Sequence, residues 1–246
     1  MSVQNLEKMQ VNKTQQQAIE HSKGPLLIVA GAGTGKTTVI TEKIKLLLSQ
    51  KIDPDQILAL TFTEKASQEM IGRLDEVMPL SYKEPWVSTF HTFGNRLLRS
   101  EALEIGLDPQ FKILTQPQQW LFLKKHLFEL DLKYYRPLGN PHRFISALIT
   151  FFSRAADEDV TPTDIRLFAE EKLKLAKDKN EQEEGEKYLE LALVMGQYTQ
   201  LNIQNSLVDF GDLIGLALTL FSQRSSILNR YQNQFKQVLV DEFQDT

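Results

Sequence analysis

The sequence predicts an α/β fold in which a parallel sheet is interrupted by an all-helical subdomain. In the first third of the chain, short apolar runs alternate with amphipathic stretches in the order βαβαβα, which is typical of a parallel sheet covered by helices. Residues 115–205 then show helical periodicity and no convincing strand. We therefore expect the first part of the sheet domain at 1–114, the helical insertion at 115–205 and the second part at 206–246.

Continuous apolar runs mark the expected strands, because a strand buried on both faces lacks the alternation of a half-exposed one. These runs cover residues 25–30, 57–61, 86–90 and 235–240. Helices are expected where apolar residues recur at helical spacing, at 36–49, 64–74, 91–104 and 188–198. The densely charged stretch 171–190 is interpreted as a solvated helix face or loop.

The composition is that of an ordinary folded protein. Of 246 residues, 41% are hydrophobic and 24% are charged, so we expect a packed core. The absence of cysteine excludes disulfides and cysteine-based zinc sites. The formal net charge of -4 means that nucleic-acid contacts must come from a local patch or from stacking. No apolar run reaches the roughly 18 residues of a membrane helix, so we expect a soluble, cytoplasmic protein with no membrane partner.

A glycine-rich loop, AGAGTGKT at residues 30–37, lies between the first expected strand and helix. It fits the phosphate-binding pattern G-x-x-x-x-G-K-S/T, except that Ala30 replaces the first glycine. Glycines let the backbone approach phosphates, and the helix start attracts anions. Lys36 would neutralise phosphate charge, and the Thr37 hydroxyl would ligate Mg²⁺. The alternative is a simple turn between strand and helix, which the strand–loop–helix context disfavours.

The last expected strand ends in two carboxylates, Asp241 and Glu242. In enzymes with a phosphate loop the first acid holds Mg²⁺. Glu242 would then orient or deprotonate the attacking water, and Gln244 would sense the terminal phosphate. The alternative is a pair of solvent-facing acids at a strand end, and the phosphate loop in the same chain favours the catalytic interpretation.

These two motifs and four other segments resemble superfamily 1A DNA helicases of the UvrD/PcrA/Rep type. The four segments are VNKTQQQA at 11–18, TFTEKASQEM at 61–70, STFHTF at 88–93 and LVDFGDL at 207–213, and DEFQDT at 241–246 closely matches the family's acidic motif. The resemblance implies a RecA-like P-loop NTPase domain with an inserted helical subdomain. It also implies an ATP- and Mg²⁺-dependent DNA helicase or translocase, 3′ to 5′, acting in DNA repair, replication or recombination.

The resemblance also implies roles for individual residues. Gln15 would read the adenine edge, since an amide both donates and accepts. The phosphates would be held by Ala32, Gly33, Thr34, Gly35, Lys36, Thr37 and Thr38, with Thr37 and Asp241 on the metal and Lys36, Asp241, Glu242 and Gln244 in catalysis. Single-stranded DNA would be contacted by Thr61, Phe62, Thr63, Lys65, Thr89 and His91. A core role for Phe62 and a structural role for His91 are the alternatives.

Three positions depart from the family pattern. Glu64 stands where asparagine is common, Gly211 replaces the first aspartate of the FDDL segment, and Thr38 stands where many members have arginine. Glu64 is also compatible with nuclease-linked relatives, so the motor part of a helicase–nuclease remains an alternative.

The expected partners are single-stranded DNA, junctions of single and double strands, and a second RecA-like domain of the same protein. That domain would supply an arginine worth about 10³–10⁵ in rate, so we expect this chain alone to bind Mg-ATP weakly, hydrolyse it slowly and not unwind DNA. Two other functions are a different P-loop enzyme, such as a small-molecule kinase or transport ATPase, and a non-catalytic DNA-binding module. Intact Lys36, Thr37, Asp241 and Glu242 disfavour the latter.

Overall fold

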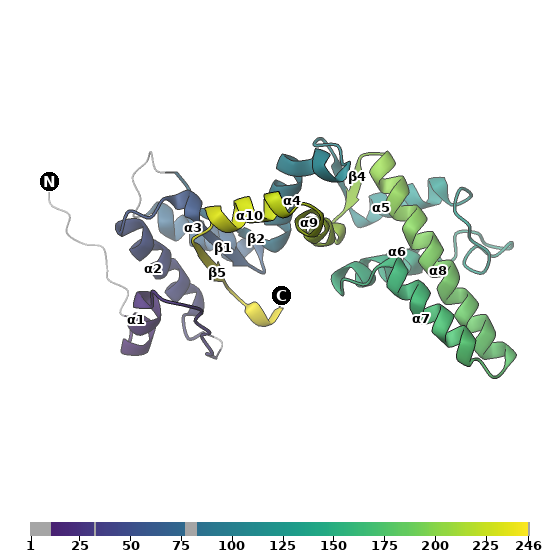
Figure 1. Ribbon diagram of the computed structural model, residues 1–246, viewed down its shortest axis with the longest axis horizontal. Helices are drawn as coiled ribbons and strands as arrows, with labels where there is room; N and C mark the ends of the chain where they lie inside the picture. Colours follow the sequence, from purple (N-terminus) through teal and green to yellow (C-terminus); the bar gives the residue numbers. More distant parts are fainter. Residues whose placement is uncertain (1–10, 32, 77–82, 246) are drawn as a thin grey trace. The chain divides into compact units, whose positions relative to one another are not determined.

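The computed structural model describes residues 11–31, 33–76 and 83–245, which form two compact units (Figure 1). Unit 1 comprises residues 1–93 and 228–246, and unit 2 comprises residues 94–227. Unit 1 is a parallel sheet with helices, and unit 2 is mainly helical. The predicted α/β class, with a parallel sheet and a long helical region between its parts, is confirmed.

The sheet of unit 1 consists of β1 (Ile57–Thr61), β2 (Trp86–Thr89) and β5 (Gln237–Val240) in the order β2-β1-β5. All pairings are parallel, and Leu58 lies opposite Trp86 on one side and Val238 on the other. β1 is paired along both edges, and each of its residues is buried, with side chains of α2 and α3 packed against Ile57 and Ala59. The strands predicted at 57–61, 86–90 and 235–240 are therefore confirmed, although β5 is an edge strand with Val238 exposed.

The described residues of unit 1 also form helical elements, two of which extend across the boundary into unit 2. They are α1 (Lys13–Glu20), α2 (Lys36–Ser49), η1 (Pro54–Gln56), α3 (Glu64–Asp75), α4 (Phe90–Glu101), α10 (Ser225–Gln234) and η3 (Phe243–Asp245). Ile44 of α2 and Met70 of α3 pack with Ile57 and Ala59 of β1 in a continuous core. The helix predicted at 36–49 agrees with α2, and α3 and α4 lie within a few residues of the predicted helices.

The strand predicted at residues 25–30 is wrong. These residues form no regular secondary structure, and the Leu27 and Val29 side chains are 72% and 88% exposed. An apolar run becomes a strand only if neighbouring strands satisfy its N–H and C=O groups. The strands of this sheet are β2, β1 and β5 in the described residues, and none of them pairs with residues 25–30.

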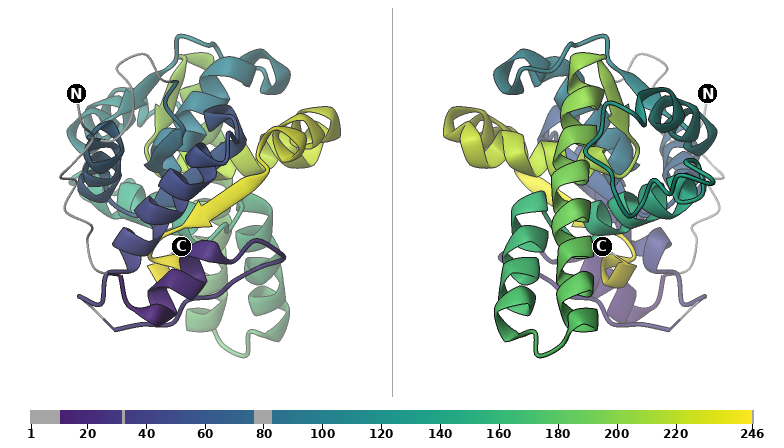
Figure 2. Two further views of the ribbon diagram at one scale, coloured as in Figure 1. Left: turned by 90° about the vertical axis from the view of Figure 1, so that its left-hand side faces the viewer. Right: turned by 90° about the vertical axis from the view of Figure 1, so that its right-hand side faces the viewer.

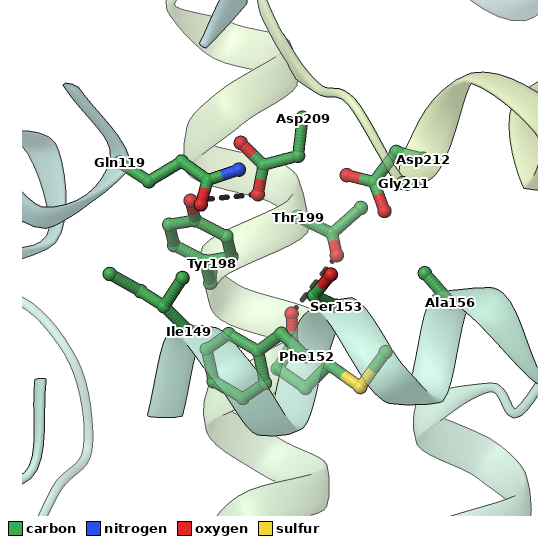
Figure 3. A pocket seen from close by; sticks show the side chains of 11 residues that line it. Gln119, Ile149, Phe152, Ser153, Ala156, Tyr198, Thr199, Asp209, Gly211 and Asp212 are labelled. Carbon is green, nitrogen blue, oxygen red and sulfur yellow. Dashed lines mark hydrogen bonds between the residues drawn. The ribbon is translucent and has the colours of Figure 1, made fainter. Parts of the chain in front are cut away.

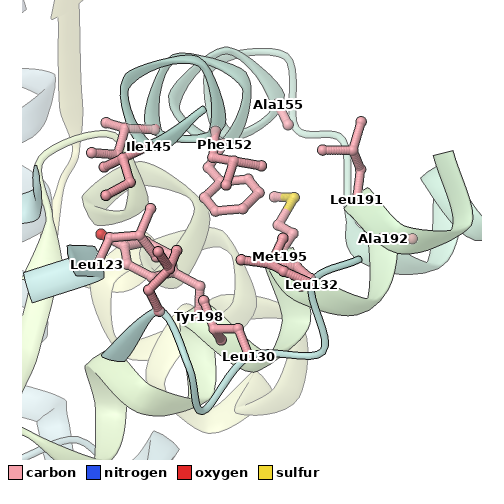
Figure 4. Close-up of a cluster of buried hydrophobic side chains, with 14 of the residues drawn as sticks. Leu123, Leu130, Leu132, Ile145, Phe152, Ala155, Leu191, Ala192, Met195 and Tyr198 are labelled. Carbon is pink, nitrogen blue, oxygen red and sulfur yellow. The ribbon is translucent and has the colours of Figure 1, made fainter. Parts of the chain in front are cut away.

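Unit 2 has its own hydrophobic core, shown in Figure 4. Its elements are η2 (Ala102–Ile105), β3 (Lys112–Leu114), α5 (Gln116–His126), α6 (Ile145–Asp157), α7 (Pro162–Leu175), α8 (Lys179–Gln204), β4 (Leu207–Asp209) and α9 (Asp212–Gln223). Leu123, Ile145, Phe152 and Val194 are almost completely buried in this core. The prediction of helices without strands between residues 115 and 205 is confirmed for that fully described segment.

The charged stretch 171–190 spans the turn between α7 and α8, which run side by side (Figure 2). Lys172 and Glu184 form an ion pair of 2.9 Å across the two helices. Lys187 and Glu183 form another of 2.6 Å within α8. The charges therefore lie on a solvated helical hairpin, as the sequence predicts.

The unit boundaries differ from the predicted 115–205 insertion. The short strand β3 pairs in parallel with β4, with Ile113 opposite Val208. This ladder and the buried cluster around Phe111 and Leu213 join both flanks of the helical region to unit 2. No helix in the described part of the chain is long and apolar enough to cross a membrane.

Candidate functional site

The glycine-rich loop ends at the first residue of α2. Gly33 and Gly35 have φ angles of 74° and 84°, a conformation that favours glycine. Lys36 extends back over the loop, and its Nζ donates to the carbonyl oxygens of Ala30 (3.1 Å) and Gly31 (3.2 Å). The ammonium thus lies over the loop beside the free N–H groups of a helix start, which is suited to a polyanion. The predicted contact Ala32 lies outside the described residues.

Gln15 connects α1 to this loop. Its Nε2 donates to the Thr34 carbonyl (2.9 Å), and its Oε1 accepts from the Asn12 N–H (2.8 Å). A β-carbon on Gly35 would come within 3.1 Å of the Gln15 amide nitrogen, so only glycine fits without a shift. Each amide atom retains one further hydrogen-bonding position. The predicted adenine contact of Gln15 stays a prediction.

Thr37 and Asp241 meet although they are far apart in the sequence. The Thr37 hydroxyl donates to Asp241 Oδ2 at 2.8 Å across a separation of 204 positions. Asp241 follows β5, its N–H donates to the Leu60 carbonyl (2.8 Å), and it is only 3% exposed. A hydroxyl and a carboxylate oxygen at this spacing are the hard oxygen ligands that Mg²⁺ prefers, and such sites take their other ligands from phosphate and water.

Glu242 and Gln244 follow Asp241 in a tight bend. The Glu242 N–H donates to Asp241 Oδ1 (3.1 Å), and Glu242 has a φ of 50°, which is uncommon for a residue with a side chain. The Gln244 amide donates to the Glu242 carboxylate. Both predicted catalytic side chains therefore lie at the carboxyl end of β5, next to Asp241.

Arg73 is a residue of this region that the sequence analysis missed. Its Nη1 donates to the Thr38 hydroxyl at 3.2 Å, and Nη2 forms an ion pair with Glu69. Position 38 is where many family members have arginine, so a guanidinium from α3 lies beside that position here. The sequence predicts a helix at 64–74 that contains Arg73, but nothing in the sequence placed that helix next to Thr38.

The predicted DNA contacts lie where β1 and β2 end. Phe62 directly follows β1 and is 55% exposed, and Lys65 is exposed one turn further on. Thr63 caps α3 by accepting the Ala66 N–H (3.2 Å). Phe62 is therefore not a core residue. Thr61, another predicted DNA contact, is buried, and its hydroxyl has no hydrogen-bond partner among the described residues. The DNA assignments of these residues stay predictions.

Glu64 joins the ends of the two strands. Its Oε1 accepts from the hydroxyls of Thr92 (2.6 Å) and Thr89 (2.8 Å). These two hydrogen bonds, above all that of Thr92, hold the pKa of Glu64 below its ordinary value, and the positive field of His91 acts in the same direction. Thr89 is buried, whereas Thr92 and Glu64 are exposed. Thr92 was not among the predicted contacts, although it lies in the segment 88–93.

Unit 2 contains a second polar cluster, in the segment that resembles the FDDL motif. Asp209 accepts from the Tyr198 hydroxyl (2.8 Å) at a small pocket that Asp212 also lines (Figure 3). Apolar side chains, among them Ile149 and Phe152, form the opposite wall. Burial raises the pKa of Asp209. Burial and then the charge of Asp209 raise the pKa of Asp212 to about 7.

Comparison with known proteins gives concordant matches. A family model described as "UvrD/REP helicase N-terminal domain" matches residues 11–246. The chain is 36% identical over 247 residues to a "Probable DNA helicase II homolog" of Mycoplasma capricolum, covering 100% of this chain and 32% of that protein. It is 36% identical over 239 residues to "ATP-dependent DNA helicase PcrA" of Staphylococcus aureus, covering 96% of this chain and 30% of the relative. The chain thus spans about a third of the length of these relatives.

Proposed function

The chain belongs to the UvrD/REP helicase N-terminal family, and on that premise we propose that it is the ATP-binding part of a DNA helicase motor. The contact between Thr37 and Asp241 carries this proposal. A loop that binds phosphate and an acid that binds metal are useful only if they face the same ligand, and these side chains are within hydrogen-bonding distance.

ATP would bind with its phosphates over the loop between Gly33 and Thr37. Lys36 would turn from the carbonyls of Ala30 and Gly31 to the β and γ phosphates, and the start of α2 would add N–H donors. Mg²⁺ would be held by Thr37 and Asp241 and would neutralise charge on the phosphates. Glu242 would accept a proton from the attacking water, and Gln244 would position the Glu242 carboxylate.

Single-stranded DNA would bind where β1 and β2 end. Phe62 would stack on a base, an interaction worth about 1–3 kcal/mol and tolerant of sequence. Lys65 would contact a phosphate. Translocation, in the 3′-to-5′ direction, would need a second motor domain that closes on ATP and supplies an arginine, so the 246-residue chain alone would turn over slowly and would not unwind duplexes.

Binding of a fluorescent ATP analogue tests the nucleotide site. We expect Lys36→Ala to weaken binding about tenfold or more, because a hydrogen bond to a charged group contributes about 1.5–3 kcal/mol. Thr37→Val should chiefly remove the Mg²⁺ dependence of binding. Lys23→Ala is the matched control, since Lys23 is an exposed lysine outside the loop. Equal affinity of Lys36→Ala and the unaltered chain would contradict the proposal.

ATP turnover in the presence of single-stranded DNA tests the motor assignment. We expect the 246-residue chain to hydrolyse ATP very slowly with or without DNA. Addition of the remaining domains should restore rapid, DNA-stimulated turnover. Fast hydrolysis by the chain alone would refute the need for a second domain, and turnover of the complete protein that ignores DNA would refute the helicase assignment.

A further inference from the structure

The Glu64 carboxylate lies beside the first turn of α4. One of its oxygens accepts two hydroxyl protons, from Thr92 at 2.6 Å and from Thr89 at 2.8 Å. The Thr92 N–H in the first turn of α4 donates to the Thr89 hydroxyl (3.2 Å). Hydroxyls and backbone N–H groups at a helix start are the donors that proteins use for phosphate.

The hydroxyl protons of Thr89 and Thr92 are already donated within this cluster. A threonine hydroxyl has a single proton to donate, and an ionised carboxylate has none. The Thr92 proton is donated to Glu64, and the Thr89 proton has two acceptors, Glu64 Oε1 at 2.8 Å and the Thr92 hydroxyl oxygen at 3.1 Å. A DNA phosphate arriving here would therefore meet acceptor oxygens and a negative charge. A glutamate with its ordinary pKa is already ionised at neutral pH, and the two hydroxyls lower the pKa of Glu64 further in the same direction.

The surroundings of the cluster are those of the proposed DNA surface. Glu64 and Thr92 are exposed, and Phe62 and Lys65 flank Glu64 in the sequence. An acid near the start of a helix stabilises the helix by about 0.3–1 kcal/mol without any partner. The stability of α3 alone therefore does not require bonds to a threonine of β2 and a threonine of α4.

We propose that the Glu64 carboxylate imitates a DNA phosphate: it fills a phosphate position made by Thr89, Thr92 and the start of α4, and it lowers the affinity of the chain for single-stranded DNA. This inference rests on the proposed function. It makes Glu64 a residue that sets DNA affinity, because DNA must displace the carboxylate to reach the Thr92 hydroxyl.

Fluorescence anisotropy with a labelled oligothymidylate, measured over a range of salt concentrations, tests the proposal. Glu64→Gln keeps the length of the side chain and removes its charge. We expect it to bind about three- to tenfold more tightly, because a like charge is lost and a phosphate displaces a neutral amide oxygen from the two hydroxyls more easily than a carboxylate oxygen. Its plot of log affinity against log salt should steepen by less than the value of about 0.7 for one phosphate neutralised on a single strand, because a hydroxyl carries no positive charge.

Two further variants separate local displacement from a general charge effect. Glu84→Gln makes the same change in net charge just before β2, at the opposite end of that strand, on an exposed side chain, and it should leave affinity unchanged. The gain from Glu64→Gln should disappear in a Thr92→Val background, because the hydroxyl that would receive the phosphate is gone.

The outcomes distinguish the inference from the function on which it rests. If the unaltered chain binds DNA and Glu64→Gln binds equally or more weakly, the inference is overturned and the DNA-binding function stands. A gain that survives Thr92→Val also overturns it, in favour of long-range charge. If neither the unaltered chain nor Glu64→Gln binds DNA at low salt, both the inference and the proposed DNA site fail.

Discussion

Replacement of Asp212 by asparagine should stabilise unit 2 at neutral and alkaline pH. Burial and the nearby charge of Asp209 raise the pKa of Asp212 from 3.8 to about 7. A carboxyl group whose pKa is higher in the folded state binds more protons there, so the free energy of unfolding falls as the pH rises. The contribution of Asp212 is complete below about pH 4 and is lost as the pH rises to about 7.

The size of the effect follows from the two pKa values. At about 1.4 kcal/mol per pKa unit, the rise from 3.8 to about 7 sets an upper limit of about 4 kcal/mol. Asp212→Asn cannot ionise, so it should be more stable than the unaltered chain by up to that amount at pH 8 and nearly equal to it at pH 4. Tyr198 and Asp209 line the same pocket, and Asp157 lies beside Gly211, which also lines it. Asp209 should therefore keep part of the pH dependence in the variant.

Denaturant unfolding followed by circular dichroism at pH 4 and pH 8 measures the difference. Glu171→Gln, which neutralises an exposed acid on α7, should show no such pH-dependent gain. Titration of the Asp212 carboxyl by NMR gives its pKa directly. If Asp212→Asn and the unaltered chain keep a constant difference in stability from pH 4 to pH 8, the reasoning is refuted.

Two further predictions concern packing in unit 2. Leu123→Ala should lower the free energy of unfolding by about 2–5 kcal/mol, because Leu123 is 0% exposed in the core. Leu121→Ala, at an exposed neighbour in α5, should change the free energy of unfolding by about 0.5 kcal/mol or less. Equal effects of the two variants in denaturant unfolding would contradict the core assignment. Gly94→Ala should destabilise by about 1–3 kcal/mol, because its β-carbon would lie 3.1 Å from the Leu213 carbonyl oxygen. Gly215→Ala, where a β-carbon meets no described atom within 4 Å, should be neutral or slightly stabilising, and a thermal melt that ranks the two variants in the reverse order would argue against this close approach.

The sequence was informative where local chemistry decides the structure. The loop around Gly35 and the helix that starts at Lys36 follow from residue types alone, and the buried strand β1 follows from five consecutive residues that fit a buried sheet. Residues 25–30 show the limit of this reasoning. Their apolar pattern indicates what burial would stabilise, but a strand also needs partners, and pairing is a property of the whole sheet.

Contacts between distant segments could not be predicted from spacing. Glu64 accepts hydrogen bonds from two threonine hydroxyls that are 25 and 28 positions away in the sequence. The position of Glu64 in its motif did not indicate these bonds. The bond from Arg73 to Thr38 spans 35 positions in the same way. The meeting of Thr37 with Asp241 was expected only because two motifs that need one another occur in one chain.

The separation of 204 positions between Thr37 and Asp241 has a consequence for biosynthesis. All of unit 2 lies between them, so a ribosome must make it before Asp241 exists and can accept the Thr37 hydroxyl proton. At translation rates of about 5–20 residues per second, the wait is on the order of 10–40 s. During this interval β1 has no β5 beside it, and the nascent chain carries an open strand edge of the kind that mispairs.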